Sequence, residues 1–257
     1  MSQVGATSVR MFKELIREKV VIFWTIAFPA LWLVMSNFIF LNGVPAEVKG
    51  SILGVFTVSM AVYGLMVAGT VDLPANIASD GANGILAKLR SMPVKPWHDF
   101  AGRLMAFTAF GVIAIGVVAA MGYILGARIA FTASGLAGSL VFLALAFMAA
   151  SGIGLIIGAF VVKEQSASMT GIIISLVGGF IGGIFVSFSQ LPAFLQCFAQ
   201  LYPLSASTSS IVYLLFGEHF AGYNPLTLEL VALNVALSVG LFVMGQFLYA
   251  RRCWRAQ

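Results

Sequence analysis

The chain has 257 residues, of which 60% are hydrophobic and only 9% are charged, and its formal net charge is +5. A soluble domain carries about 25% charged residues, so this composition excludes an ordinary soluble enzyme and indicates a membrane protein. A spanning helix needs about 20 mostly apolar residues. Continuous runs of that length predict an all-α protein with six transmembrane helices, at residues 20–41, 51–71, 103–126, 135–162, 169–190 and 226–250.

A short amphipathic helix is predicted ahead of the first apolar run. Residues 7–20 place apolar side chains at helical spacing, with charged side chains between them. Such a helix is expected to lie at the inner membrane surface, close to anionic headgroups. Residues 1–19 therefore form either a membrane anchor or a contact surface for a partner, at the start of a single membrane domain that covers residues 1–257.

The positions of Lys and Arg predict how the chain is oriented in the membrane. If both termini are cytoplasmic, twelve of the 14 basic residues fall on the cytoplasmic side, and only Lys49 and Arg128 fall outside. The positive charge is then explained by topology in a plasma or inner cell membrane, and nucleic acid is not expected as a partner. Cys197 and Cys253 fall on opposite sides in this topology, so they are not expected to pair.

Glycines are frequent in the later predicted helices. Gly178 and Gly182 are four residues apart, as are Gly179 and Gly183, and this spacing lets another backbone approach closely. The pattern predicts helix packing, either within the bundle or at a subunit interface or pore wall.

The longest connection between predicted spans covers residues 191–225, and its apolar core is too short to cross a membrane. It predicts an outer re-entrant hairpin of two short helices. Aromatic side chains are expected to line this hairpin: Phe194, Phe198, Tyr202, Tyr213 and Phe216.

No constellation of catalytic or metal-binding residues is visible in the sequence. His98 and His219 fall on opposite sides of the membrane, and the acidic residues are expected at membrane edges or in loops. Glu229 is either a helix-start acid or a titrating relay. Ion-coupled carriers need ionisable groups near the membrane midplane, and none is predicted there. The chain also lacks a phosphate-binding loop, so any ATP hydrolysis must occur on another subunit.

The polar interruption between the second and third spans, residues 72–102, is predicted to be a cytoplasmic loop. Asp80 is expected to cap a short helix with Ile85, Leu86 and Leu89 on one face, ended by Pro93. The loop is either a solvated connection with positive-inside charges or a docking site for a soluble partner.

The order DGANGILAKLRSMPV, from Asp80 to Val94, resembles the segment after the second helix in permeases of the ABC-2-type exporter family, and is similar to multidrug and daunorubicin-type export permeases. The resemblance extends over the whole chain. It implies a homo- or heterodimer of permeases bound to two ATP-hydrolysing subunits, which carry the ATP and Mg²⁺. It also assigns an ATPase-coupling role to a set of residues in this segment: Asp80, Gly84, Ile85, Leu86, Leu89 and Pro93. Many family members carry Glu and Arg before the Gly; here the ionic contact is expected either to be altered or to be held by Asp80 alone.

The resemblance further implies alternating access, with the cargo passing between two permeases. The resemblance implies that side chains of the second and fifth helices line the pathway. On this chain they are Phe56, Met60, Tyr63, Phe180, Ile184 and Phe188. Packing within the bundle is the alternative role for each of them. Their apolar faces favour export of a hydrophobic or amphiphilic compound, drug-like or lipid-like. A lipid-linked glycan exporter and a non-transporting membrane assembly protein remain as alternatives.

Overall fold

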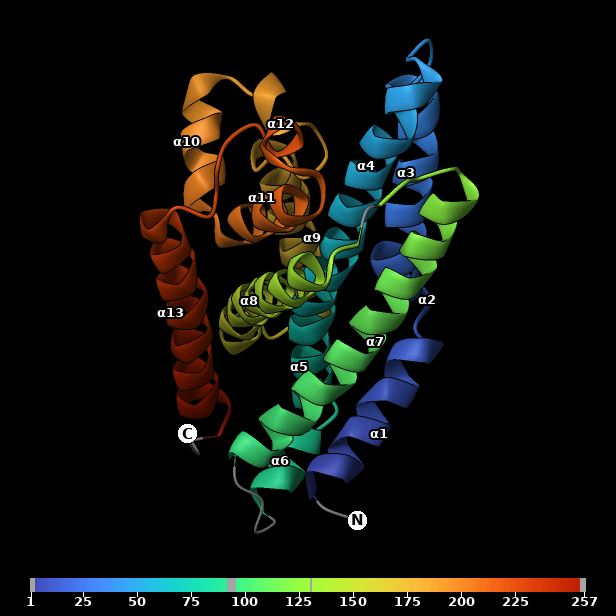
Figure 1. The fold of residues 1–257 in the computed structure, drawn as a ribbon. Coiled ribbons are helices and arrows are strands. Elements are labelled where there is room, and N and C mark those ends of the chain that lie inside the picture. Colours follow the sequence, from blue (N-terminus) through green and yellow to red (C-terminus); the bar gives the residue numbers. More distant parts are fainter. Residues whose placement is uncertain (1–2, 92–95, 130, 255–257) are drawn as a thin grey trace.

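The computed structural model describes residues 3–91, 96–129 and 131–254, and this part of the chain contains helices and no strands. Five helices are long and apolar enough to cross a membrane: Lys19–Ile39, Glu47–Ala82, Trp97–Ile124, Ala133–Phe160 and Leu228–Cys253. The prediction of an all-α membrane protein is confirmed. Both termini lie at the same end of the bundle, together with α1 and α6 (Figure 1).

The α-helices follow one another as α1 (Gln3–Arg17), α2 (Lys19–Ile22), α3 (Phe28–Ile39), α4 (Ala46–Val67), α5 (Leu73–Ala82), α6 (Ile85–Arg90), α7 (Pro96–Ile124), α8 (Ala133–Phe160), α9 (Glu164–Ile181), α10 (Ala193–Leu201), α11 (Pro203–Phe216), α12 (Glu218–Ala221) and α13 (Leu228–Cys253). Two π-helical turns, η1 (Phe23–Ala27) and η2 (Ala68–Asp72), and one 3₁₀ turn, η3 (Phe188–Gln190), are the other helical elements in the described part of the chain.

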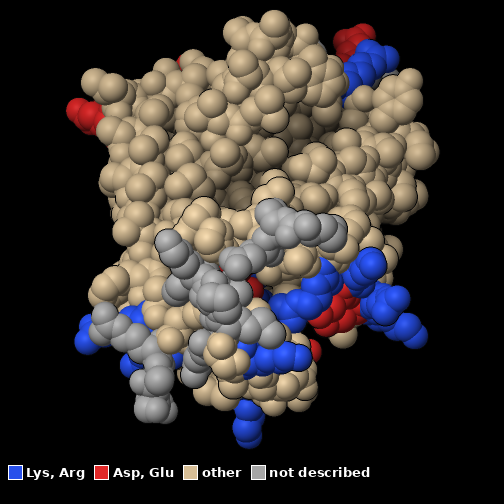
Figure 2. Space-filling model, turned by 90° about the horizontal axis from the view of Figure 1, so that it is seen from below, with Lys and Arg blue, Asp and Glu red and all other residues tan. Residues whose placement is uncertain are grey.

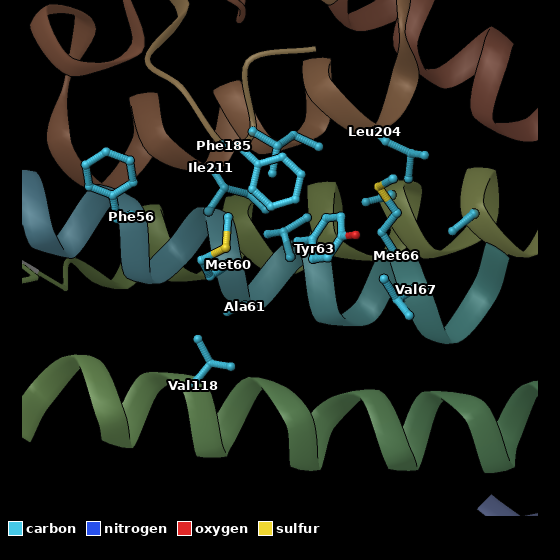
Figure 3. Packing of buried hydrophobic residues seen from close by; sticks show 14 of the residues in the cluster. Phe56, Met60, Ala61, Tyr63, Met66, Val67, Val118, Phe185, Leu204 and Ile211 are labelled. Atoms are coloured by element: carbon cyan, nitrogen blue, oxygen red, sulfur yellow. The ribbon is translucent and has the colours of Figure 1, made fainter. Parts of the chain in front are cut away.

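The helix formed by α4, η2 and α5 is the centre of the bundle. It is the most deeply buried of the five long helices, with α7 packed on one side and α8, α9 and α11 on others. Figure 3 shows Val118 of α7 pointing toward α4, while Met60 and Tyr63 point toward Phe185 and Ile211. Because all sides of this helix are covered by protein, its apolar side chains form the main hydrophobic core.

The second predicted span is longer than expected. It was predicted to end at residue 71, and residues 72–102 were predicted to be a loop, but the helix continues to Ala82 and α7 begins at Pro96. The loop prediction is therefore wrong for much of this range. The polar residues that suggested a loop, including Asp72 and Asp80, are instead buried within the helix.

Two prolines explain the two π-helical turns. A proline inside a helix clashes with the carbonyl group four residues earlier and cannot donate a backbone hydrogen bond. Pro29 follows η1 and Pro74 follows η2, and in each case the residue before the proline donates its N–H five residues back: Phe28 to Phe23, and Leu73 to Ala68. The wider turn lets each helix continue past its proline.

Glycines on neighbouring helices pack against the carbonyl groups beside these prolines. A methyl group at Gly171 of α9 would overlap the carbonyl oxygen of Thr70, and one at Gly64 of α4 would lie 2.7 Å from that of Thr25. Thr25 and Thr70 each stand four residues before a proline. Two side-chain hydrogen bonds lie beside these close backbone contacts. The Thr25 hydroxyl donates to Asp72 at 2.7 Å, and the hydroxyls of Thr70 and Ser175 are hydrogen-bonded at 2.5 Å.

The fifth predicted span is shorter than expected. The run 169–190 was predicted to cross the membrane, but α9 ends at Ile181 and the chain turns at Gly183, which has a φ of +76°. The count of six spans stays a prediction. Residues 191–225 contain two main helices, α10 and α11, at the end of the bundle opposite the termini (Figure 1). Whether they re-enter the membrane also stays a prediction.

We predict that Gly171→Ala will lower the apparent melting temperature of the purified protein. The added methyl group would overlap the Thr70 carbonyl, so α9 would have to move away from η2. Gly116→Ala is the matched control because nothing lies within 4 Å of its added methyl group, and alanine in a helix interior is favoured by about 0.5–1 kcal/mol. Scanning fluorimetry in detergent checks this. Equal melting temperatures for the two variants would contradict the close packing of α9 on η2.

Candidate functional site

The side chain of Arg103 is the centre of a buried ionic cluster near the end of the bundle that carries both termini. Arg103 is on α7 and is fully buried. Its Nε donates to Asp99 Oδ2 at 2.8 Å, and its terminal nitrogens donate to Asp80 Oδ2 and Asn76 Oδ1 on α5. One guanidinium group therefore pairs with carboxylates from two helices.

Arg10 adds α1 to the same cluster. Its two terminal nitrogens donate to the two carboxylate oxygens of Asp80 at 3.0 and 2.9 Å, which is the bidentate geometry of a strong charge-assisted pair. Asn76 donates to Glu14 Oε2 of α1 at 3.1 Å. Ser8 also donates to the carbonyl of Gly102 at 2.9 Å. The amphipathic helix α1 is thus attached by polar contacts to α5 and α7.

Tyr249 adds α13 to the cluster. Its hydroxyl donates to Asp99 Oδ2 at 2.8 Å, and the side chain is fully buried. Four helix segments that are distant in sequence, α1, α5, α7 and α13, are therefore linked through Asp80, Asp99 and Arg103. A buried charge network of this kind constrains geometry, because losing one member leaves the others buried without compensation.

The short helix α6 follows this cluster directly. It begins after Gly84, which has a left-handed φ of +70°, and no side chain caps it. The expectation that Asp80 caps α6 is wrong: Asp80 lies inside α5 and its carboxylate is used by Arg10 and Arg103. Of the predicted coupling residues, Leu86 is buried, Ile85 and Leu89 are half-buried and Gly84 is exposed. Pro93 lies outside the described residues.

The end of the bundle with α1 and α6 is charged. Figure 2 shows many Lys and Arg side chains on this face, with acidic side chains beside one group of them. An open groove runs beside α6, between α5 and the ends of α8 and α13, and Leu86, Phe160 and Arg252 are among its lining residues. Arg252 lies over the Phe160 ring, 4.0 Å from its centroid. This face has the mixed charge and apolar surface that a soluble partner would contact.

The six predicted pathway residues lie in two neighbouring places. Phe56, Ile184 and Phe188 line a narrow crevice near the end opposite the termini. Met60 and Tyr63 are fully buried, and Tyr63 is in contact with Phe185, which also contacts Phe180. Five of the six side chains are buried within one chain, and only Phe180 is substantially exposed, at 44%. Their role in a pathway stays a prediction.

The predicted packing glycines lie at the end of α9. A methyl group at Gly178 would lie 2.7 Å from the Tyr202 hydroxyl, one at Gly179 would overlap the Phe185 ring, and one at Gly182 would lie 3.0 Å from Ser205 Cβ. Gly182 is the C-cap of α9, and Gly183 is in the turn that follows.

Sequence reasoning missed a second acidic site, at Asp72. It placed acidic residues at membrane edges or in loops, but Asp72 is buried in η2, within the long helix, and lines a pocket together with Glu18, Lys19 and Glu164. Partial burial, followed by the charges of Glu164 and Glu14, raises the pKa of Glu18 above its ordinary value of 4.5. The T-x-x-x-P spacing of Thr70 and Pro74 is the signal that could have indicated a helix continuing past this acid.

These observations define the class of protein: a multi-pass helical membrane protein with a charged end built around α1, α6 and a buried ionic cluster. The profile of the ABC-2 type transporter family matches residues 2–216, which is most of the chain, and the chain therefore belongs to this family. A comparison with individual curated proteins gives no match. Family membership makes the chain a permease subunit of an ABC transporter, and it implies an ABC ATPase as partner.

We predict that Asp80→Asn will destabilise the protein strongly. Removing one partner of a buried ion pair costs about 3–5 kcal/mol, because Arg103 stays buried with less compensation. At about 2–4 °C per kcal/mol for a chain of this size, the apparent melting temperature should fall by about 10 °C. Glu229→Gln is the control, since it makes the same change in an exposed side chain on α13. A small effect, equal in the two variants, would contradict the structural role of Asp80.

We also predict a pH-dependent effect of Glu18→Gln. A carboxyl group with a raised pKa binds its proton more tightly in the folded than in the unfolded state, so ionised Glu18 destabilises the fold at neutral pH. Glu18→Gln should raise the melting temperature at pH 7–8, and the gain should fade as the pH falls toward 4.5. Glu218→Gln, on α12, is the control. A gain that does not change with pH would contradict the prediction.

Proposed function

We propose that the chain moves a hydrophobic or amphiphilic compound, drug-like or lipid-like, out of the cytoplasm or inner leaflet. In this proposal two permease chains form a dimer with two ABC ATPase subunits, which bind the ATP and Mg²⁺. Both termini and α6 face the cytoplasm of a cell membrane. The proposal follows the family of the chain and the gathering of basic side chains at the end with α1 and α6 (Figure 2).

The observation that carries the proposal is the continuous helix from Glu47 to Ala82, which leads directly to α6. At 1.5 Å per residue it is about 50 Å long. One of its ends is attached through Asp80 to α1 and α7, and its other half carries Phe56, Met60 and Tyr63. A displacement of α6 by an ATPase would therefore be transmitted along this helix to three of the six proposed cargo-lining residues, Phe56, Met60 and Tyr63.

An open apolar face supports the proposed dimer. Along α9, side chains at helical spacing are exposed, namely Met169, Ile173, Val177 and Phe180. This stripe lies near the pocket that contains Asp72 and Glu164, to which Met169 also contributes. A second permease chain covering this face would bring two such surfaces together.

Coupling is tested at α6. The buried position of Leu86 means that Leu86→Asp would disturb packing as well as docking, so Leu89 and the exposed Lys88 are better positions. We predict that Leu89→Asp and Lys88→Glu will each lower cargo-stimulated ATP hydrolysis about tenfold in the complex with its co-purified ATPase. The reason is that both changes place a negative charge on the proposed docking surface.

Leu228→Asp is the matched control, because it adds an aspartate at an exposed leucine on the start of α13, away from α6. It should leave hydrolysis unchanged. Full stimulation in the Leu89→Asp variant, with normal chain levels, would reject the coupling role of α6. Purification of a stoichiometric complex without an ATPase would instead support a membrane assembly protein.

A further inference from the structure

An open pocket lies between α4, α7 and α11, toward the end of the bundle opposite the termini (Figure 1). Its volume of about 660 Å³ is within the range of about 300–1,000 Å³ that is typical of ligand pockets. Of the described residues, only Phe220 lines both this pocket and the narrow crevice that contains Phe56 and Ile184, so the two are separate places. We call it the Arg128 pocket. The lining side chains that decide its chemistry are Ser51, Tyr123, Arg128, Phe131, Phe216 and Phe220.

Arg128 is held against α4 by its backbone and by its side chain. Its N–H donates to the carbonyl of Gly50 at 2.9 Å, and a methyl group at Gly54 would lie 2.7 Å from its carbonyl oxygen. A methyl group at Gly50 would lie 3.0 Å from both Cγ and Cδ of Arg128, so the aliphatic stem lies directly on the helix. Figure 1 shows the connection from α7 to α8 passing beside α4. Two glycines one helical turn apart therefore make room for Arg128 and limit where its guanidinium can reach.

Arg128 forms no ion pair within the described part of the chain. The ion pairs there involve Arg10 and Arg103, and no acidic residue lines the Arg128 pocket. The Arg128 side chain is exposed, and Ser51 and Tyr123 add hydroxyl groups to the same pocket. A guanidinium group donates two parallel hydrogen bonds to a phosphate or a carboxylate. The pocket therefore has the chemistry to bind an anion.

The Arg128 pocket lies at the depth where phospholipid phosphates are expected. The candidate span on α7 ends at Ile124, and Arg128 follows four residues later, just beyond the hydrocarbon core. Tyr123, Ile124 and Phe131 are largely exposed, and exposed apolar side chains such as Val117 continue along α7. Tyrosine is enriched at this membrane boundary. An aliphatic chain can therefore enter the pocket from the membrane while a phosphate stays at the boundary.

We propose that the Arg128 pocket binds one anionic phospholipid, with its phosphate at Arg128 and an acyl chain along the rings of Phe131 and Phe216. The rings supply apolar surface for the chain. A zwitterionic head group is disfavoured, because its ammonium group would find no carboxylate in the pocket. The bound lipid would contact α4, α7 and α11 together. It is a resident of the membrane and not the proposed cargo, so the site requires neither an ATPase nor transport.

Native mass spectrometry of the full chain in detergent measures how tightly the first lipid binds. Dioleoyl-phosphatidylglycerol is the anionic probe, and dioleoyl-phosphatidylcholine is the matched probe with the same chains and a neutral head group. The wild type should bind phosphatidylglycerol about tenfold more tightly, because hydrogen bonds between charged groups are the strong ones. Arg128→Gln should remove this preference. Arg128→Lys should keep about a third of it, since an ammonium group lacks the two parallel donors.

Controls separate the pocket from a general attraction between charges. Lys49→Gln removes the other basic residue expected at this end of the bundle, which does not line the pocket, and should leave the preference unchanged. Gly50→Ala tests position at constant charge. Its added methyl group would displace the stem of Arg128, so the affinity for phosphatidylglycerol should fall about threefold. Millimolar inorganic phosphate should not displace the lipid, because it makes no use of the apolar rings.

Three results would overturn the proposal. The first is equal affinity of the wild type for the two lipids. The second is an equal loss of affinity in Arg128→Gln and Lys49→Gln, which would mean that overall charge attracts the lipid. The third is displacement of the lipid by inorganic phosphate, which would make the pocket a site for free anions. Loss of the preference in Arg128→Gln and weaker binding in Gly50→Ala, with Lys49→Gln unchanged, would support it.

Discussion

The buried guanidinium of Arg103 is the interaction on which the charged end of the molecule depends. It pairs with Asp80 on α5 and with Asp99 on its own helix, while Arg10 and Tyr249 attach α1 and α13 to the same two carboxylates. A fully buried charge is costly unless it is paired. The four helices α1, α5, α7 and α13 must therefore stay together for the charges to remain compensated. The position of α6, immediately after α5, follows from this constraint.

The π-helical turns before the two prolines determine how much of the molecule is connected to this ionic cluster. Pro74 would ordinarily end or kink the second span, but the wider turn of η2 lets the helix continue from α4 into α5. The Thr25–Asp72 and Thr70–Ser175 hydrogen bonds attach the neighbouring segments η1 and α9 at the same level. The ionic cluster, the π-helical turn and the core around Tyr63 are therefore connected by one continuous helix.

The sequence was sufficient to predict the class of the fold, because 60% hydrophobic composition and continuous apolar runs leave few alternatives. The amphipathic N-terminal helix and a short helix between Asp80 and Pro93 were also predicted, and α1 and α6 lie in these parts of the chain. What could not be predicted was the burial of Asp72, Asp80 and Asp99. Each is a polar residue near the end of an apolar run, and local pattern favours a loop or cap there. Their partners, Thr25, Arg10 and Tyr249, are 47, 70 and 150 residues away, so only the tertiary structure reveals the pairing.

A cluster of aromatic rings around Phe185 connects the long helix to the less regular part of the bundle. Tyr63 belongs to α4, Phe28 and Trp32 to α3, and Phe180 to α9, whereas Phe185 is on the turn beyond Gly183. A shift of α4 relative to α9 changes the distance between Tyr63 and Phe180, both of which contact Phe185. The Phe185 ring is fully buried between these side chains, so a different spacing of the two helices would require it to repack. The packing of the Phe185 ring therefore depends on how the long helix is placed relative to α9.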